Sequence, residues 1–200
     1  MAKPGWLNTS KSSGSGNDTV GVSTLAPHNG RTARSGDLTF RASGVTDKIV
    51  AVTQNGRPEY VTIESAKAAG QAGGNITISG KTNSSKLTFS LGTGDLVITL
   101  PTQYTAHSMD TNNGAAISGD PGAAQEIDYS ITITVPVNSV TEELTKQVIV
   151  TANGGQNGVC LITQAATAAT LSVTPASLTL DWEGAEQTLT VTSNTSWTII

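Results

Sequence analysis

The sequence predicts an all-β protein made of β-sandwich modules, one complete and one divided between the two termini. Short segments in which apolar and polar residues alternate recur along the 200 residues, as half-buried strands do. Clusters of Gly, Asn, Asp and Pro separate them and are typical of turns. The third observation is an internal repeat that relates both ends of the chain to its middle.

Composition excludes several classes of function. Charged residues make up only 13% of the chain, the net charge is −4, and the eleven Lys and Arg residues are spread out, so no basic stripe for nucleic acid is present. No apolar run approaches the roughly 18 residues of a membrane span, and the first residues lack the apolar core of a secretory signal. One cysteine and two histidines exclude a disulfide framework and a Cys/His zinc site. We therefore expect no cofactor and no metal, and neither nucleic acid nor membrane as a partner.

The expected strands are short and follow one another with the spacing of a sandwich rather than of βαβ units. The Ala-rich segment 65–72 contains Gly70 and is expected to be a loop. The longest irregular stretch is expected at 102–125, which is rich in Asn, Gly and Asp. Strands are expected at 38–40, 48–53, 60–63, 76–78, 87–91, 96–100, 129–135, 147–151, 159–163, 171–173, 178–180, 188–192 and 197–200.

Two segments near the N-terminus and in the middle have counterparts about 110 residues later. Residues 41–54 match 151–164, with Ala, Gly, Thr and Gln in register. Residues 60–89 correspond to 171–200, because each has a strand, a Gly-containing turn, another strand and an Asn-Ser-Ser or Asn-Thr-Ser step. The sequence is therefore a repeat array in which the two termini lie inside a repeat unit rather than between units.

These matches divide the chain into three parts. Residues 57–165 hold a complete module, 1–56 hold only a second half, and 166–200 hold only a first half. Each half alone would leave open sheet edges and an uncovered apolar face. Three arrangements satisfy both halves: closure within one chain as a circular permutation, completion of one chain's head by the tail of another, or continuation in a longer array.

The terminal segments resemble the BACON family, and the middle module does so more loosely because it keeps the Asn-Ser-Ser step but lacks the Trp. The resemblance implies an immunoglobulin-like β-sandwich. It further implies a spacer or proposed glycan-binding module, as in gut-bacterial surface enzymes and in virion proteins of their phages. The residues that carry it are 171–180, 183–184 and 191–199 for the front of the domain, and 6–7, 12–17, 29–30, 33–36, 38–40 and 52–54 for its back.

The chain offers no arrangement that indicates catalysis. Residues 74–80 place five residues between two glycines, whereas a phosphate-binding loop needs four. His28 and His107 lie in Gly- and Asn-rich surroundings without a nucleophile elbow. Cys160 lies inside an alternating strand, where a small buried apolar residue is the usual role. We expect a protein that is not an enzyme.

The leading hypothesis is a structural protein of a phage virion: a capsid-decoration, head-fibre or tail-associated component made in the host cytoplasm without a signal peptide. Its partners would be further copies of itself and other virion proteins. The alternatives are a carbohydrate-binding adhesion module that contacts surface glycans, and a spacer domain of a secreted glycoside hydrolase. The candidate self-assembly residues are Trp6, Leu7, Val191, Trp197 and Ile199, and the candidate glycan contacts are Trp182 and Tyr104.

Overall fold

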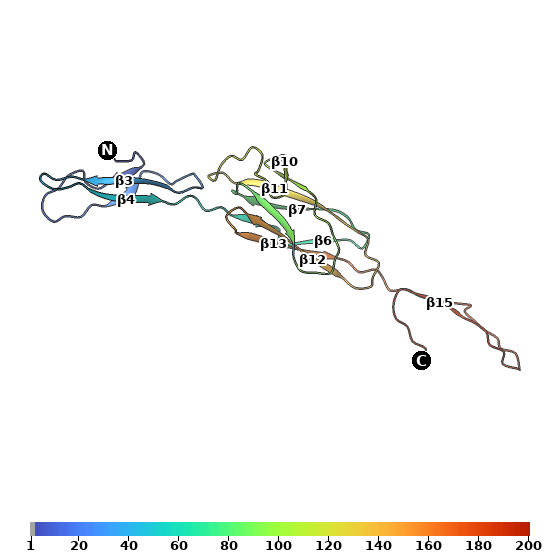
Figure 1. The fold of residues 1–200 in the computed structure, drawn as a ribbon. Coiled ribbons are helices and arrows are strands. Elements are labelled where there is room, and N and C mark those ends of the chain that lie inside the picture. The colour runs from blue at the N-terminus through green and yellow to red at the C-terminus, as the bar shows by residue number, and fades with distance from the viewer. Residues whose placement is uncertain (1–2) are drawn as a thin grey trace.

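A computed structural model describes residues 3–200 as three parts in a row, with a complete sandwich between an N-terminal and a C-terminal part (Figure 1). Met1 and Ala2, with which the predicted half-module 1–56 begins, lie outside the described residues. Every regular element among residues 3–200 is a β-strand, so the all-β prediction is confirmed. Within that part of the chain, no helix is long and apolar enough to cross a membrane.

The middle sandwich consists of two sheets. Their order is that of an immunoglobulin-like domain, with the first, third and seventh of the module's nine strands in one sheet and the last two strands in the other. The larger sheet has the order β10 (Met109–Asn112), β9 (Gln103–Ala106), β11 (Ile127–Val135), β7 (Gly74–Thr82) and β5 (Val61–Ile63), and the smaller has β6 (Ala66–Ala69), β13 (Asn157–Gln164), β12 (Leu144–Ala152) and β8 (Leu87–Leu91).

Strand β6 corrects the expectation of a loop at 65–72. Its four residues pair in parallel with β13, from Leu161 opposite Ala66 to Gln164 opposite Ala69. Alanine has a low intrinsic preference for strands, but an edge strand of four residues needs little more than a partner with free backbone groups. The ladder of β13 supplies those groups, and Ala69 is buried.

The inner faces of the two sheets form one apolar core. Strand β11 alternates buried and exposed residues along its whole length, as a strand covered on one face does. The Phe89 ring packs against Tyr104 and Tyr129, with ring centroids 5.0 and 5.8 Å apart. Such tilted aromatic pairs add to the free energy gained by burying their area.

The N-terminal part contains two separate pairs of strands. Strand β1 (Leu7–Thr9) pairs with β2 (Val22–Thr24), and β3 (Arg34–Phe40) pairs with β4 (Lys48–Gln54). Both pairs are antiparallel. The C-terminal part has a single pair, β14 (Leu171–Thr174) with β15 (Thr190–Ser193).

Three segments expected to be strands are not strands in the structure: 96–100, 178–180 and 197–200. The first still alternates, because Leu96 and Ile98 are buried. In the second and third, the apolar residues are exposed and no neighbouring strand is present to pair with them. Conversely, β9 and β10 form a hairpin inside 102–125, which was expected to be irregular.

The sandwich core allows a matched test of burial. Val148 is fully buried on β12, whereas Val97 on the same module is 79% exposed. Removing two methyl groups from Val148 loses their burial and leaves a cavity, so Val148→Ala is expected to lower the free energy of unfolding by about 2–3 kcal/mol. Val97→Ala should change it by less than about 0.5 kcal/mol. Urea unfolding followed by far-UV circular dichroism, which reports on the backbone, measures the free energy of unfolding of both variants. Equal effects would contradict the assigned core.

Candidate self-assembly interface

The hairpin β3–β4 has the same register as the hairpin β12–β13. Arg34 lies opposite Gln54 in the first, and Leu144 lies opposite Gln164 in the second. Each residue of the N-terminal hairpin is therefore placed like the residue 110 positions later. The N-terminal part is folded as the second half of a module.

Polar side chains that fix the backbone recur with the same spacing. The Gln164 side-chain amide donates to the Pro136 carbonyl at 2.6 Å, and the Gln54 amide is placed toward the Ala26 carbonyl at 3.4 Å. Both glutamines thus tie the end of the last strand to the same turn. The shared glutamine that the repeat predicts has one structural role in both places.

His28 occupies the position of Asn138 rather than a catalytic site. The Asn138 amide donates to the Glu142 carbonyl at 2.9 Å, and His28 Nε2 lies 2.7 Å from the Thr32 carbonyl. The imidazole therefore closes the same loop that the asparagine closes in the middle module.

The C-terminal part repeats the first half of the sandwich in the same detail. Asn83 Oδ1 accepts a hydrogen bond from the Tyr60 backbone N–H at 2.8 Å, and Asn194 Oδ1 accepts one from Thr170 at 2.7 Å. In both places the amide also donates to the carbonyl two residues before that N–H, at 3.0 and 2.9 Å. The Asn step of the sequence repeat is thus a clamp between the first strand and the end of the third.

The repeats differ in how far their equivalent apolar side chains are exposed. Phe40 is 45% exposed and Val50 is 49% exposed, whereas their counterparts Val150 and Cys160 are fully buried. In the C-terminal part, Leu189 is 49% exposed. Ile78, its counterpart in β7, is fully buried. Leu38, the counterpart of the fully buried Val148, is itself only 6% exposed. The apolar face of the N-terminal half-module is therefore open to solvent in part, around Phe40 and Val50.

Both outer edges of the β3–β4 hairpin are also unpaired. In the sandwich, β12 is flanked by β8 and β13 by β6, whereas β3 and β4 form a sheet of two strands. By the repeat, the counterparts of β6 and β8 are residues 176–180 and 197–200. Neither segment is a strand in the structure. The unpaired edges of the β3–β4 hairpin and the unpaired segments 176–180 and 197–200 are therefore complementary.

The predicted self-assembly residues are found on these two half-modules. Leu7 is fully buried, and Trp6 is partly buried with the Arg34 guanidinium 4.7 Å from its ring centroid. Val191 is partly buried on β15, and Trp197 and Ile199 are exposed. The chain does not bring the two groups together, because the N-terminal and C-terminal parts lie at opposite ends of the sandwich (Figure 1).

The two candidate glycan contacts differ sharply. Tyr104 is only 3% exposed and lies in the sandwich core against Phe89, so its ring has no free face for a sugar, and its assignment as a glycan contact is wrong. Burial raises the pKa of its phenol. Trp182 is 92% exposed at the tip of a turn that the Gly184 N–H closes onto the Asp181 carbonyl at 3.1 Å.

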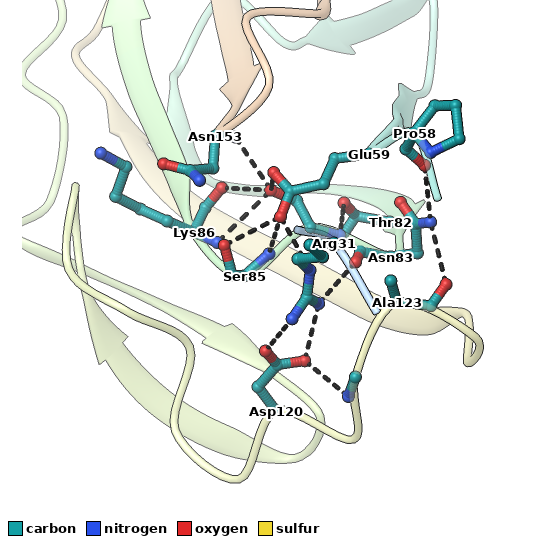
Figure 2. Close-up of polar contacts among 12 residues, drawn as sticks. Arg31, Pro58, Glu59, Thr82, Asn83, Ser85, Lys86, Asp120, Ala123 and Asn153 are labelled. Atoms are coloured by element: carbon teal, nitrogen blue, oxygen red, sulfur yellow. Dashed lines mark hydrogen bonds and ion pairs between the residues drawn. The ribbon is translucent and has the colours of Figure 1, made fainter. Parts of the chain in front are cut away.

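A partly buried ionic junction joins the N-terminal half-module to the sandwich, and sequence reasoning missed it. Figure 2 shows the Arg31 guanidinium between two carboxylates. Its two terminal nitrogens donate to Asp120 at 2.6 and 2.9 Å, and Nε lies 2.7 Å from Glu59 Oε1. One terminal nitrogen also donates to the Asn83 carbonyl at 2.7 Å. A single arginine thus links three segments that are distant in the sequence, and no motif marks it.

Glu59 is the buried centre of this junction. Its carboxylate accepts hydrogen bonds from the Ser84 hydroxyl at 3.0 Å and from the Ser85 N–H and hydroxyl at 3.2 and 2.9 Å. A buried carboxylate needs such partners, because an uncompensated charge in the interior is costly. Glu59 follows the linker between the two modules, so the junction fixes the point where the linker enters the sandwich.

The pKa of Asp120 is below its ordinary value of 3.8. Partial burial alone would raise it, but hydrogen bonds from Arg31 and from the Gly122 N–H outweigh that effect. Both bonds favour the ionised carboxylate. The ion pair is therefore fully formed at neutral pH.

The second junction, between the sandwich and the C-terminal part, has no arginine. Residues 139–142 and 193–197 line an open groove of about 730 Å³ there. Thr141 stands at the position that corresponds to Arg31, and Ala169 at that of Glu59. Comparable segments therefore meet at both junctions, but only the first is held by charges.

The comparisons with known proteins concern the N-terminal half-module and the fold. The family model BACON, described as "Putative binding domain, N-terminal", matches residues 1–55, which confirms the resemblance over that segment. A solved structure of a Bacteroides ovatus GH5 xyloglucanase in complex with a XXXG heptasaccharide is 14% identical, with a TM-score of 0.32. The similarity covers 54% of this chain and 19% of the enzyme's. No curated protein sequence matches the chain.

Replacing Arg31 tests the junction against an exposed ion pair of the same kind. Arg31→Ala leaves buried Glu59 without its cation and is expected to lower the free energy of unfolding by about 2–4 kcal/mol. The control is Arg41→Ala, which breaks the exposed Arg41–Asp47 pair and should cost less than about 1 kcal/mol. Urea unfolding measures both variants. Similar small losses would show that the junction does not hold the two modules together.

The same junction predicts a pH dependence. Because the folded pKa of Asp120 is lowered, its ion pair stabilises the fold above the unfolded pKa of about 3.8, and this contribution is lost as the pH falls through the lower folded value. Asp120→Asn should therefore lose stability at pH 7 and show a shallower decline below pH 4 than the parent. Thermal melts between pH 2.5 and 7 test this, and parallel curves would contradict it.

Proposed function

We propose that the chain is a non-enzymatic structural protein that assembles head to tail, with the C-terminal half-module of one copy completing the N-terminal half-module of the next. One observation carries the proposal: each half repeats the hydrogen bonds and register of its counterpart in the sandwich, while apolar side chains that the counterpart buries, such as Phe40, Val50 and Leu189, stay about half exposed. A second copy of the chain supplies the missing strands in the required order.

The geometry favours completion between copies over closure within one chain. The two halves lie at opposite ends of the sandwich (Figure 1), and Arg31 holds the N-terminal half in its place. A tail that meets the head of another copy makes a heterologous contact, which closes into a ring or continues as a filament. The added segments would pair as edge strands, by the mode in which chains complete an open sheet.

The proposed setting is the virion of a phage, as a capsid-decoration, head-fibre or tail-associated component. Two features support it: the resemblance to a family found in such proteins, and an assembly joint built into the repeat. The partners would then be other copies and neighbouring virion proteins. Made in the host cytoplasm, the protein would need neither a signal peptide nor a cofactor.

A second candidate function is glycan binding. Trp182 is 92% exposed on a turn that also carries Asp181 and Glu183, and the family model that matches residues 1–55 is described as a putative binding domain. Exposed aromatic rings flanked by polar side chains are a common means of binding sugars. This alternative needs no contact between copies.

The test is the mass in solution across a dilution series. Size exclusion with light scattering is expected to show discrete or growing oligomers of the 20.4 kDa chain. Phe40→Asp places a charge on the open face of the N-terminal half, and Leu189→Asp does so on the C-terminal half. Each variant alone should be a monomer. The two mixed should form a 1:1 dimer, because Phe40→Asp keeps the C-terminal face intact and Leu189→Asp keeps the N-terminal face intact.

The control is Val97→Asp, a charge at an equally apolar but exposed position of the sandwich, which should leave the oligomers unchanged. Deleting residues 193–200 should abolish assembly and leave the sandwich folded. A monomer at every concentration, or Phe40→Asp and Leu189→Asp oligomers of unchanged size, would overturn the proposal.

A further inference from the structure

We infer that Trp182 is a docking residue for a second copy of the chain, and that its ring packs on the Arg57 guanidinium of the next copy, beside His28. The inference rests on the proposed head-to-tail assembly and names the contact that orients it. It follows from placing the C-terminal turn where its counterpart lies in the complete sandwich.

The turn around Trp182 has a counterpart of the same shape in the middle module. The Gly73 N–H donates to the Gly70 carbonyl at 3.0 Å, and the Gly184 N–H donates to the Asp181 carbonyl at 3.1 Å. Gly73 and Gly184 have φ angles of 70° and 71°, a left-handed conformation that favours glycine. By this match, Trp182 stands where the sandwich has Gln71.

Gln71 shows what that position contacts in a complete module. Its carbonyl accepts a hydrogen bond from the Asn138 N–H at 2.8 Å, and its side-chain amide donates to the Asn138 carbonyl at 2.6 Å and to Thr167 Oγ1 at 2.9 Å. The position therefore lies between the loop at 138 and the first residues after the last strand. The loop belongs to the second half of the module, and Thr167 to the linker that directly follows it.

The N-terminal half-module of the recipient and the linker that follows it contain counterparts of both contacts. The Thr167 N–H donates to the Val140 carbonyl at 2.8 Å, and the Arg57 N–H donates to the Gly30 carbonyl at 2.8 Å, so Arg57 is placed like Thr167. His28 is placed like Asn138, as shown by the loop that each closes. The contacts of Gln71 thus point to Arg57 and His28 for Trp182.

The side chains at these positions fit one another chemically. Where the sandwich has Gln71 against Thr167, the joint between two copies would have the larger side chains of Trp182 and Arg57. A guanidinium over an indole face is a favourable cation–π contact. Arg57 is exposed, and among residues 3–200 its side chain has one hydrogen bond, to Asn29 Oδ1 at 3.4 Å. Asp181 and Glu183 flank the ring, so an acidic turn meets a basic one. A docked Trp182 would also account for a tryptophan that is 92% exposed in the single chain.

The experiment uses the mixture of Phe40→Asp and Leu189→Asp chains, which isolates one joint. Trp182→Ala is added to the Phe40→Asp chain, which donates the C-terminal half, and Arg57→Ala to the Leu189→Asp chain, which receives it. Each is expected to raise the Kd of the 1:1 dimer about 5- to 20-fold, and the two together little more than one alone. Sedimentation velocity measures the Kd.

Two controls separate this contact from general damage. Trp182→Phe, which keeps an aromatic face, should recover most of the affinity. Lys81→Ala in the recipient chain, which removes an exposed cation of the sandwich, should leave the Kd within twofold. A dimer whose Kd is unchanged by Trp182→Ala would overturn this inference and leave head-to-tail assembly standing. Absence of any dimer would overturn the proposed function itself. Saturable binding of a soluble xyloglucan oligosaccharide that Trp182→Ala abolishes, with the dimer unaffected, would assign the ring to glycan binding instead.

Discussion

A pair of antiparallel strands in water has two unpaired edges and two faces, and it holds its shape only when a second sheet covers its apolar face. The β12–β13 hairpin meets this requirement: β8 and β6 pair with its edges, and the sheet that contains β7 and β11 covers it. The β3–β4 hairpin has the same register but none of these neighbours. The open faces at both ends of the chain follow from this one difference.

The two junctions of the chain differ in the contacts that hold them. Arg31 binds the N-terminal half-module to Glu59 and Asp120 of the sandwich, whereas Thr141 and Ala169 stand at the second junction. In a head-to-tail assembly, each completed module would be fixed to the sandwich that follows it and linked more loosely to the one before. Stiff and compliant joints would therefore alternate along a filament, and the compliant one allows a tail to reach its partner.

The sequence predicts the all-β class, the repeat and most long strands, because alternation is strong where one face is buried, as along β11. It fails where tertiary pairing decides: alanine-rich β6 is a strand because β13 lies beside it, and 197–200 is not because nothing does. Alternation also shows that Leu96 and Ile98 face the core, without saying that their backbone joins a ladder. Tyr104 was predicted as a glycan contact because it lies in a polar stretch of sequence, but only the tertiary structure decides whether an aromatic side chain there is exposed. Arg31 had no local signal in the sequence because its partners come from distant segments.

The repeat is carried more faithfully by its backbone-binding amides than by its core. Gln54 and Asn194 keep the positions and bonds of Gln164 and Asn83, although the middle module has lost the tryptophan of the termini. These amides act within a half-module, since each ties a strand end to a neighbouring turn or strand of the same half. Each half therefore keeps its turns and strand ends in place, although its apolar face still needs a covering sheet. In the proposed assembly, completion would order the unpaired segments 176–180 and 197–200, and an interface that is already shaped loses less conformational entropy on association.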